Sequence, residues 1–448
     1  MALAQIAQTF YPRALVRLVL LLEDWGAGTT DLYTVTATPR EVEIHRNDAR
    51  TADTIRLQLD LRDFPFDPRT VRSVKVELYL GDILAPTGGI DVDVDNFGAF
   101  TGFSDSIEAI RSEAGDFVTI EGRDFTGLFL DTAWPGGMID VTQTLADVIS
   151  TIIDAVPGAG QIGQSPPICY SPGADSVILA DAIGRKKFTP QQKDDCWTVL
   201  VDLCGRVGLV PVFVLDVLCI LSPADFGVSR TDFVNDGVLT TLSSTLEYGS
   251  DLTRLRYTRH AKEAARKQIE VRCWDETTRK ASTAKFPTQA IVNKATVGTD
   301  GKVTTQNAPI LPYFVTGTHT AADLATIAER VYLEASREEM EVEVETMDMV
   351  DMDNNDVTKL GNGARVTITI GKALITDIAG LSQSEAIAAL TSGPRALARD
   401  VATAFVAAFA TSQRLAISFY CKEAKHYWSR ENGYRCELTC INYVGGTA

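Results

Sequence analysis

An aspartate-rich segment, residues 351–356, carries the ligand types that calcium prefers. It reads Asp-Met-Asp-Asn-Asn-Asp, so carboxylate and amide oxygens recur at the positions that open a calcium-binding loop. Such a loop also has glycine at its sixth position and glutamate at its twelfth, where this chain has Asp356 and Asn362. The mismatch favours a solvated polar turn between two strands, and we expect no metal site.

Other patterns that carry catalysis are incomplete in this chain. The glycine-containing segments 87–89 (Thr-Gly-Gly) and 361–363 (Gly-Asn-Gly) lack the Lys-Ser/Thr of a phosphate-binding loop. No Gly-x-Ser-x-Gly and no Cys-x-x-Cys occurs, and none of the four histidines has metal-ligand spacing with another histidine or a cysteine. The sequence therefore predicts a protein that is not an enzyme, with no catalytic residue and no cofactor.

Acidic residues recur at every second position in two segments. Residues 339–345 read Glu-Met-Glu-Val-Glu-Val-Glu, and residues 91–95 read Asp-Val-Asp-Val-Asp. Successive side chains of a strand point to opposite faces, so each segment lines one strand face with carboxylates. The commoner interpretation is a solvated strand face. The functional interpretation is the wall of a conduit that repels a polyanion, because like charges along one face repel each other. The candidate lumen-facing residues are Glu339, Glu341, Glu343, Glu345, Asp91, Asp93 and Asp95.

Composition sets limits on the partners. Of 448 residues, 59 are acidic and 42 are basic, which gives a formal net charge of −17. This balance argues against general nucleic-acid binding, which uses Lys and Arg to displace counterions from phosphates. The commoner interpretation is a soluble acidic protein, and the balance is also compatible with a surface that must not adhere to DNA. The eight cysteines are scattered, and we interpret most of them as small buried hydrophobic residues.

The N-terminal apolar run, residues 15–22, is interrupted by Arg17 and followed directly by two acidic residues. No small-residue cleavage site follows in the expected place, so we interpret the run as a first strand rather than a signal peptide. The least charged later stretch, residues 401–413, is too short to cross a bilayer. We therefore expect synthesis in the cytoplasm without a targeting segment and no membrane insertion.

The elements that must position these residues are mostly strands. Residues 55–61 alternate with period two, which places Ile55, Leu57, Leu59 and Leu61 on one face. With the runs at 14–22, 31–45, 74–80 and 118–121, they predict a mostly antiparallel sheet that is closed or nearly closed.

In the middle of the chain, helix patterns follow the strand-rich N-terminal part. Thr142 can cap a helix with apolar residues at helical spacing up to Val156, and residues 189–192 form a capping box for a second helix. The apolar run at 209–221 predicts a tight hairpin. These features indicate a small inserted α+β domain.

Strand patterns return at 252–259, 268–274, 340–347 and 364–370, with one capped helix from Thr320 between them. Residues 376–413 predict two helices of unassigned role, and the chain closes with a hairpin. We divide it into residues 1–131, a first β domain; 132–236, the inserted α+β domain; 237–375, a second β domain; 376–413, a helical insertion; and 414–448, a hairpin that completes the second β domain.

The last hairpin contains three cysteines. If Asn432-Gly433 is a two-residue turn, Cys421 opposes a position near Val444 and not Cys436. An intra-hairpin disulfide is then not expected.

Short segments in order along most of the chain carry a family resemblance. They are residues 121–124 (Glu-Gly-Arg-Asp), 144–149 (Thr-Leu-Ala-Asp-Val-Ile), 248–255, 269–275, 328–331, 339–347, 359–366, 420–428 and 433–438. In this order they resemble the baseplate hub proteins of contractile-tailed phages, including the late-control-D type and the hub part of type VI spike proteins. The helical pair at 376–413 has no match in that pattern.

The resemblance implies an α+β, β-rich fold with two tube-like antiparallel β-barrel domains, the small inserted α+β domain and the helical insertion near the C-terminus. It further implies a homotrimer whose six similar units form a ring, adapting a six-fold tail tube to a three-fold spike and forming part of the DNA conduit. The implied partners are the tail tube protein, a separate spike protein, the C-terminus of the tape-measure protein and baseplate wedge proteins, with DNA only as transient cargo. The implied location is the tail baseplate of the virion, assembled in the host cytoplasm.

Two alternatives from other classes stay open. One is a peptidoglycan- or carbohydrate-cleaving tail enzyme, because two catalytic acids need no fixed sequence spacing. The other is a receptor-binding tail protein. In the favoured interpretation Arg123 and Asp124, at the end of the first β domain, serve structural pairing rather than catalysis.

Overall fold

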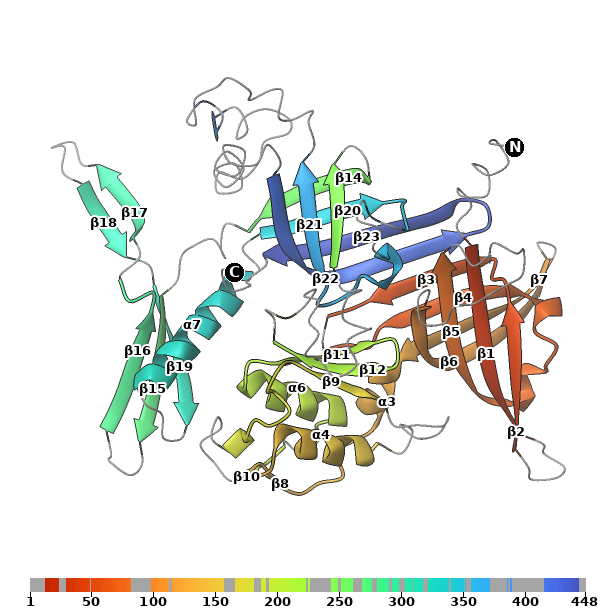
Figure 1. The fold of residues 1–448 in the computed structure, drawn as a ribbon, viewed down its shortest axis with the longest axis horizontal. Coiled ribbons are helices and arrows are strands. Elements are labelled where there is room, and N and C mark those ends of the chain that lie inside the picture. Colours follow the sequence, from red (N-terminus) through yellow and green to blue (C-terminus); the bar gives the residue numbers. More distant parts are fainter. Residues whose placement is uncertain are drawn as a thin grey trace.

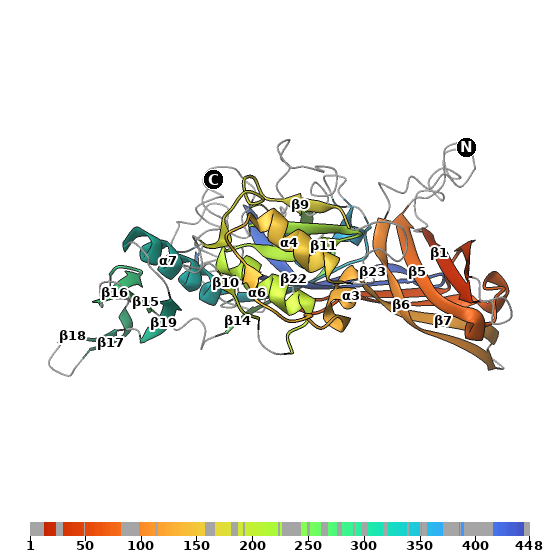
Figure 2. The ribbon, with the colours of Figure 1, turned by 90° about the horizontal axis from the view of Figure 1, so that it is seen from below.

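A computed structural model gives the fold of the chain (Figures 1 and 2). It describes residues 13–23, 30–48, 50–81, 98–112, 115–156, 166–180, 187–190, 193–222, 225, 243–248, 251–260, 268–275, 280–289, 292–297, 303–307, 309–316, 321–337, 340–349, 351, 356–370, 385, 387–388 and 415–442. The predicted helical insertion at 376–413 therefore lies almost wholly outside the described residues. Within the described ranges, no helix has the length and apolar character that a membrane crossing requires.

Seven antiparallel strands form the first sheet, at one end of the molecule (red and orange in Figure 1). Their spatial order is β2-β1-β5-β6-β7-β4-β3. The strands are β1 (Arg13–Glu23), β2 (Thr30–Ala37), β3 (Glu41–Arg46), β4 (Thr54–Asp60), β5 (Val71–Gly81), β6 (Gly98–Ser112) and β7 (Gly115–Asp124). The period-two pattern of β4 predicted one buried face, and Ile55, Leu57 and Leu59 are indeed buried in the core.

Six further strands form a closed barrel. They are β13 (Ser243–Tyr248), β14 (Leu252–Arg259), β20 (Met340–Thr346), β21 (Arg365–Ile370), β22 (Leu415–Ser429) and β23 (Gly433–Asn442). The ring closes because β22 pairs with β21 on one side and with β23 on the other. The predicted β-rich α+β fold is confirmed. Strand β13 runs parallel to β21, an orientation the strand pattern alone did not indicate.

One strand joins the two β units into a continuous thirteen-stranded sheet. The second half of β22 pairs with β3 from Ala424 opposite Arg46 to Ser429 opposite Glu41, while its first half pairs with β21. A single hydrophobic core runs under both units, with Leu18 and Leu57 from the first and Val342 and Leu438 from the second. The two β units are therefore packed as one body.

The inserted α+β part packs below this sheet around an aromatic cluster (Figures 1 and 2). Its helices are α3 (Phe125–Asp131), α4 (Leu145–Asp154) and α6 (Cys196–Arg206), and its strands are β8 (Ile139–Asp140), β9 (Ile168–Tyr170), β10 (Lys187–Phe188), β11 (Val210–Val214) and β12 (Val217–Leu221). The rings of Phe125 and Trp197 both stack on Phe213, with centroids 5.6 and 5.8 Å away. The predicted hairpin at 209–221 is present as β11 and β12.

Both predicted helix caps in this part were wrong by a few residues. Helix α4 is capped by Thr144, which forms a reciprocal capping box with Asp147, because the hydroxyl of Thr142 instead donates to Asp140. Helix α6 is capped by Asp195, which accepts from the backbone N–H of Thr198 at 2.6 Å.

A small outlying module lies at the other end of the long axis from the first sheet (Figures 1 and 2). It consists of β15 (Gln268–Asp275), β16 (Lys280–Phe286), β19 (Ile310–Thr316) and α7 (Ala321–Arg337), with the hairpin of β17 (Val292–Val297) and β18 (Val303–Asn307) beyond. The sheet order is β16-β15-β19, and α7 covers one face, with a separate core that includes Val271 and Leu324. We call β15, β16, β19 and α7 the arm. The strand at 268–274 therefore belongs to this arm and not to the barrel.

The last hairpin corrects the predicted cysteine register. Cys421 opposes Cys440 across β22 and β23. The connection is longer than expected, since Ser429 pairs with Gly433, whose φ of 73° is one that glycine adopts without strain. A register shift between Cys421 and Glu423 then moves the partner by one residue. All eight cysteines are buried and none forms a disulfide.

Candidate functional site

The acidic segment of β20 has the alternation that the sequence predicts. Val342 and Val344 are buried in the core, and Glu341, Glu343 and Glu345 are half-buried on the opposite face. Glu339 lies outside the described residues, as do Asp91, Asp93 and Asp95. The structure thus describes three of the seven candidate lumen-facing residues, all on one face of one strand.

Basic side chains of the flanking strands face this stripe. On β14, Arg254 and Arg256 lie 3.7 and 3.2 Å from the carboxylate of Glu343. On β23, Arg435 lies 3.5 Å from Glu345. These partly exposed pairs stabilise the fold weakly, but they offset the repulsion between successive glutamates. The face is therefore one of mixed charge.

His260 completes the pairing, with its Nε2 3.7 Å from Glu341. Sequence reasoning missed these partners, although Arg254 and Arg256 alternate along β14 as the glutamates do along β20. Their opposition depends on the register between two strands separated by about eighty residues of sequence, which no local pattern sets.

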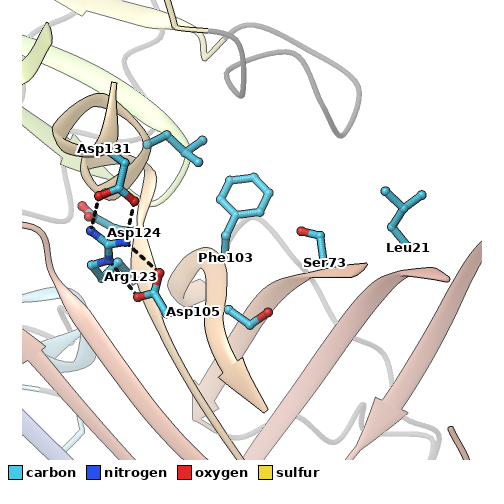
Figure 3. Close-up of a pocket in the computed structure, with 10 residues that line it drawn as sticks. Leu21, Ser73, Phe103, Asp105, Arg123, Asp124 and Asp131 are labelled. Atoms are coloured by element: carbon cyan, nitrogen blue, oxygen red, sulfur yellow. Dashed lines mark hydrogen bonds and ion pairs between the residues drawn. The ribbon is translucent and has the colours of Figure 1, made fainter. Parts of the chain in front are cut away.

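Arg123, at the end of β7, is clamped between two carboxylates (Figure 3). Its Nε and Nη2 donate to Asp105 of β6 at 2.7 and 2.8 Å, and its Nη1 and Nη2 donate to Asp131 of α3 at 3.1 and 2.6 Å. Hydrogen bonds to Asp105, then to Asp131, raise the pKa of Arg123. A pocket borders this cluster, with Leu21, Ser73 and Phe103 on its other wall (Figure 3).

This clamp joins the first sheet to the first helix of the inserted part. Gly127 of α3 lies against the guanidinium, so that a Cβ there would stand 3.0 Å from Arg123 Cβ and 3.3 Å from its Nε. Since the donors of Arg123 are used by carboxylates, the pocket offers no free cation to an anionic substrate. The arrangement agrees with the predicted structural role of Arg123.

Asp124 follows Arg123 on the strand and points the other way, into a buried cluster with Asp53 and Arg46. Arg46 Nη1 donates to Asp53 Oδ2 at 3.1 Å, and its Nη2 donates to the carbonyl of Ala99. Asp124 Oδ2 accepts from Thr126 at 2.9 Å. Burial raises the pKa of both carboxyl groups, and the nearby Asp53 raises that of Asp124 further. Two buried carboxyl groups thus lie near one buried cation, and only that of Asp53 is paired with it.

The barrel closes over this cluster. Gly361, in the predicted Gly-Asn-Gly turn, packs directly on the Arg46 side chain, where a Cβ would overlap Cδ. Beside it, buried His426 donates from Nε2 to the carbonyl of Leu360 at 2.8 Å, and its Nδ1 accepts from the Tyr434 hydroxyl at 2.7 Å. Burial first, and then the charge of Arg46, lowers the pKa of His426 to about 3, so this histidine is neutral. The glycine turn allows this close packing on Arg46.

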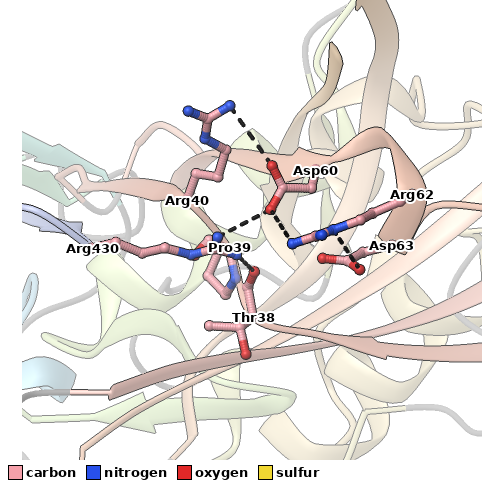
Figure 4. A network of polar contacts seen from close by, with 7 residues as sticks. All are labelled: Thr38, Pro39, Arg40, Asp60, Arg62, Asp63 and Arg430. Carbon is pink, nitrogen blue, oxygen red and sulfur yellow. Dashed lines mark hydrogen bonds and ion pairs between the residues drawn. The ribbon is translucent and has the colours of Figure 1, made fainter. Parts of the chain in front are cut away.

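A second polar network fixes the tip of the last hairpin to the first sheet (Figure 4). Arg430 donates from Nε to the carbonyl of Pro39 at 2.9 Å and from Nη2 to that of Thr38 at 2.6 Å. Its Nη1 donates to Asp60 at 3.0 Å, and Arg40 lies 3.7 Å from the same carboxylate. Arg430 thus connects the last hairpin to a part of the first sheet that lies about 370–390 residues earlier in the sequence.

The predicted calcium-like segment lies partly outside the described residues, but its two ends are described. Asp351 accepts from the Ser244 hydroxyl at 2.9 Å and from the backbone N–H of Thr245 at 2.6 Å. Asp356 caps a short 3-10 turn through Thr358. Across the described ranges, no three His, Cys, Asp or Glu side chains lie close enough together to hold a metal ion.

Comparison with solved structures shows which known proteins have a similar fold. The chain resembles a tail protein from Neisseria meningitidis at 13% identity, with a TM-score of 0.56 and 97% of each chain covered. It also resembles the 43 kDa tail protein of prophage MuSo2 from Shewanella oneidensis at 9% identity, with a TM-score of 0.52 and coverage of 96% of this chain and 98% of that one. No protein-family model and no curated protein sequence matches. The chain therefore shares its fold with phage tail proteins.

Proposed function

We propose that this chain is a structural subunit of a phage-type tail that forms the hub ring of the baseplate. The observation that carries the proposal is the joined pair of β units, in which β22 belongs to the barrel and also pairs with β3 of the first sheet. Two β units fused through a common core are suited to form a wall segment of fixed geometry. The shared fold, over nearly the full length of a tail protein, supports the same role.

In this proposal three copies form a ring of six β units. Such a ring adapts a six-fold tail tube to a three-fold spike, because each chain supplies two units to the tube side and one copy to the spike side. The partners are the tail tube protein, a separate spike protein, the tape-measure C-terminus and baseplate wedge proteins. The five-part division of the chain, at residues 131, 236, 375 and 413, is part of the same proposal.

The stripe on β20 is proposed to face the lumen of this ring, together with Glu339, Asp91, Asp93 and Asp95. Its support is the pairing of Glu343 and Glu345 with arginines of the flanking strands. A wall whose arginines are held by carboxylates presents little free positive charge to a passing polyanion. DNA is then cargo that passes without binding, in keeping with the net charge of −17.

The remaining polar clusters support a role in assembly without turnover. Three arginines, Arg123, Arg46 and Arg430, donate hydrogen bonds to carboxylates and carbonyls of other elements. These bonds hold those elements in position relative to one another. We propose that the protein is not an enzyme and that it resides in the tail of the virion.

The mass of the purified chain in solution tests the ring. A chain of 48.6 kDa predicts a particle of about 146 kDa by light scattering, the mass of a closed cyclic trimer. A mass of 48.6 kDa that persists as the concentration is raised a hundredfold would contradict a self-assembled trimer.

A further inference from the structure

Strand β2 forms one end of the thirteen-stranded sheet. It pairs with β1 along its whole length, from Thr30 opposite Glu23 to Ala37 opposite Val16. Among the described residues, no other strand pairs with the outer side of β2. A free edge of this kind presents backbone N–H and C=O groups to any strand that approaches it.

This edge lacks the features that usually protect one. Proteins blunt exposed edges with Lys, Pro, bulges or very short strands. Apart from Asp31, β2 contains no charged residue, and it contains no proline. Its register with β1 runs without a shift. Leu32 and Tyr33 are 64% and 44% exposed and point to opposite faces of the strand. We therefore expect another strand to cover this edge in the assembled protein.

The apolar surface continues from this edge onto β1. Leu32 lies opposite Leu21, and Thr34 lies opposite Val19, so these four side chains share one face of the sheet. Leu21 and Val19 are only partly buried there. Single exposed apolar residues are ordinary on a protein surface, but a contiguous group beside a free edge indicates a contact surface.

The proposed ring indicates which chain supplies the covering strand. Each β unit of a closed ring has two neighbours. Within one chain, the first sheet already meets the barrel at its other edge, where β3 pairs with β22. The second neighbour of the first sheet therefore comes from another copy, and β2 is the edge that remains for it.

On the barrel, the strand farthest from the intrachain join is β14. It lies three strands from β22 in either direction, through β21 and β13 or through β23 and β20. One side of β14 pairs with β20 along its length, but the other side meets β13 at a single pair, Tyr248 with Leu252. From Thr253 to Arg259, this second side has no partner strand among the described residues. The barrel thus has a second free edge at the position that a ring requires.

We propose that β2 of one copy pairs with β14 of the next copy, so that the sheets of neighbouring subunits join edge to edge. The two strands lie apart within one chain, so the contact is made between copies (Figure 1). It uses two different strands and is therefore head-to-tail, and such contacts close into a ring when the rotation between copies allows it. This inference rests on the proposed ring and names the strands that hold its subunits together.

Photo-crosslinking of the full chain tests the contact directly. A benzoylphenylalanine that replaces Thr34 samples the edge of β2, and the same probe in place of Met138 samples an exposed position on the inserted part. We expect the probe at 34 to give crosslinked dimers and trimers on a denaturing gel, with several-fold less from position 138. Mass spectrometry should find the links on peptides that contain β14. Links within one chain only, or links to peptides outside the barrel, would overturn the inference.

A charged substitution separates this inference from the ring itself. Leu32→Lys places on β2 the residue that commonly protects a free edge, and Met138→Lys is the matched control, since the two side chains are 64% and 61% exposed. We expect Leu32→Lys to raise the concentration needed for the trimer mass roughly tenfold or more, with unchanged circular dichroism. The control should behave as wild type. A Leu32→Lys variant that is trimeric at the same concentrations as wild type overturns the β2 contact and leaves the ring standing. A wild-type chain that is monomeric at every concentration overturns both.

Discussion

Arg430 Nη1 lies 3.0 Å from Asp60 Oδ2 although 370 residues separate them in the sequence. The same guanidinium reaches two backbone carbonyls of the first sheet, and the backbone N–H of Arg430 donates to the carbonyl of Arg40 at 3.1 Å. The tip of the last hairpin is thus fastened to the connection between β2 and β3. This contact and the β3–β22 pairing join the two β units.

Arg430→Ala should weaken the attachment of the hairpin tip to the first sheet. It removes three hydrogen bonds and leaves two carbonyls without their donor, which costs about 1–3 kcal/mol of unfolding free energy. Arg430→Lys should recover only part of the loss, because an ammonium cannot span all three acceptors. Urea unfolding measures both values.

Arg62→Ala is the control for this position. Arg62 also lies near Asp60, at 3.6 Å, but its side chain is 80% exposed, so its loss should cost less than about 0.5 kcal/mol. Equal losses in the two alanine variants would show that the position of Arg430 has no special structural role.

Gly361→Ala should strain the contact between the barrel and Arg46. The new methyl group would overlap Arg46 Cδ and stand 3.2 Å from its Cβ, and Arg46 is held in place by Asp53. We expect a loss of about 1–3 kcal/mol in unfolding free energy, the usual cost of overpacking. Thermal and urea unfolding measure it.

Gly205→Ala is the matched control, because a Cβ there meets nothing within 4 Å. Gly205 lies inside α6, where alanine is the better helix former, so this variant should gain up to about 1 kcal/mol. A Gly361→Ala variant as stable as wild type would show that Arg46 moves freely, contrary to the packed junction.

Asp124 should make stability depend on pH in a direction unusual for a carboxylate. Its folded pKa is raised well above the ordinary value, so between the unfolded and folded pKa values the native state binds the proton and the unfolded state does not. Its contribution to stability is therefore full at low pH and is lost as the pH rises through the folded pKa. Asp124→Asn, which is neutral at every pH, should remove that loss.

The measurement is the difference in unfolding free energy between Asp124→Asn and wild type, followed from pH 4 to pH 9. We expect the variant to gain relative to wild type as the pH rises. Asp53 accepts from Arg46 and from the backbone N–H of Asn47 at 2.8 Å, so Asp53→Asn should destabilise the fold by weakening the pair with Arg46. A difference for Asp124→Asn that stays constant with pH would refute a raised pKa.

The thiols should be inert in the folded protein. All eight cysteines are buried and none is in a disulfide, and burial raises the pKa of Cys196 to about 11 and of Cys204 to about 12. We expect no fast reaction with a thiol reagent such as DTNB under native conditions, and eight reactive thiols after denaturation without reductant. Fewer than eight would reveal a disulfide, with Cys421 and Cys440 as the first pair to examine.

The sequence predicted best the features that depend on a single strand, such as which of its side chains are buried. The alternation of Val342 and Val344 with the glutamates follows from strand geometry alone, and so does the burial of Ile55 and Leu57. The order of short motifs pointed to a tail-protein fold, and the structure shares that fold.

The sequence did not predict features that depend on the register between two distant strands, or on which of two suitable residues caps a helix. The pairing of Arg256 with Glu343 and of Cys421 with Cys440 requires a strand register that a bulge or a turn shifts by one residue. Thr142 and Thr144 are both good caps by type, and only the contact with Asp140 removes Thr142 from that role. The arm has ordinary strand patterns, and nothing local shows that its sheet stands apart from the barrel.

The most direct test of the central claim is a cryo-electron microscopy reconstruction of the purified chain. The account predicts three copies around an open channel, six β units in the ring, and Glu341, Glu343 and Glu345 on the channel wall. A ring with these glutamates on its outer wall would contradict the lumen assignment. A particle without three-fold symmetry would contradict the hub itself.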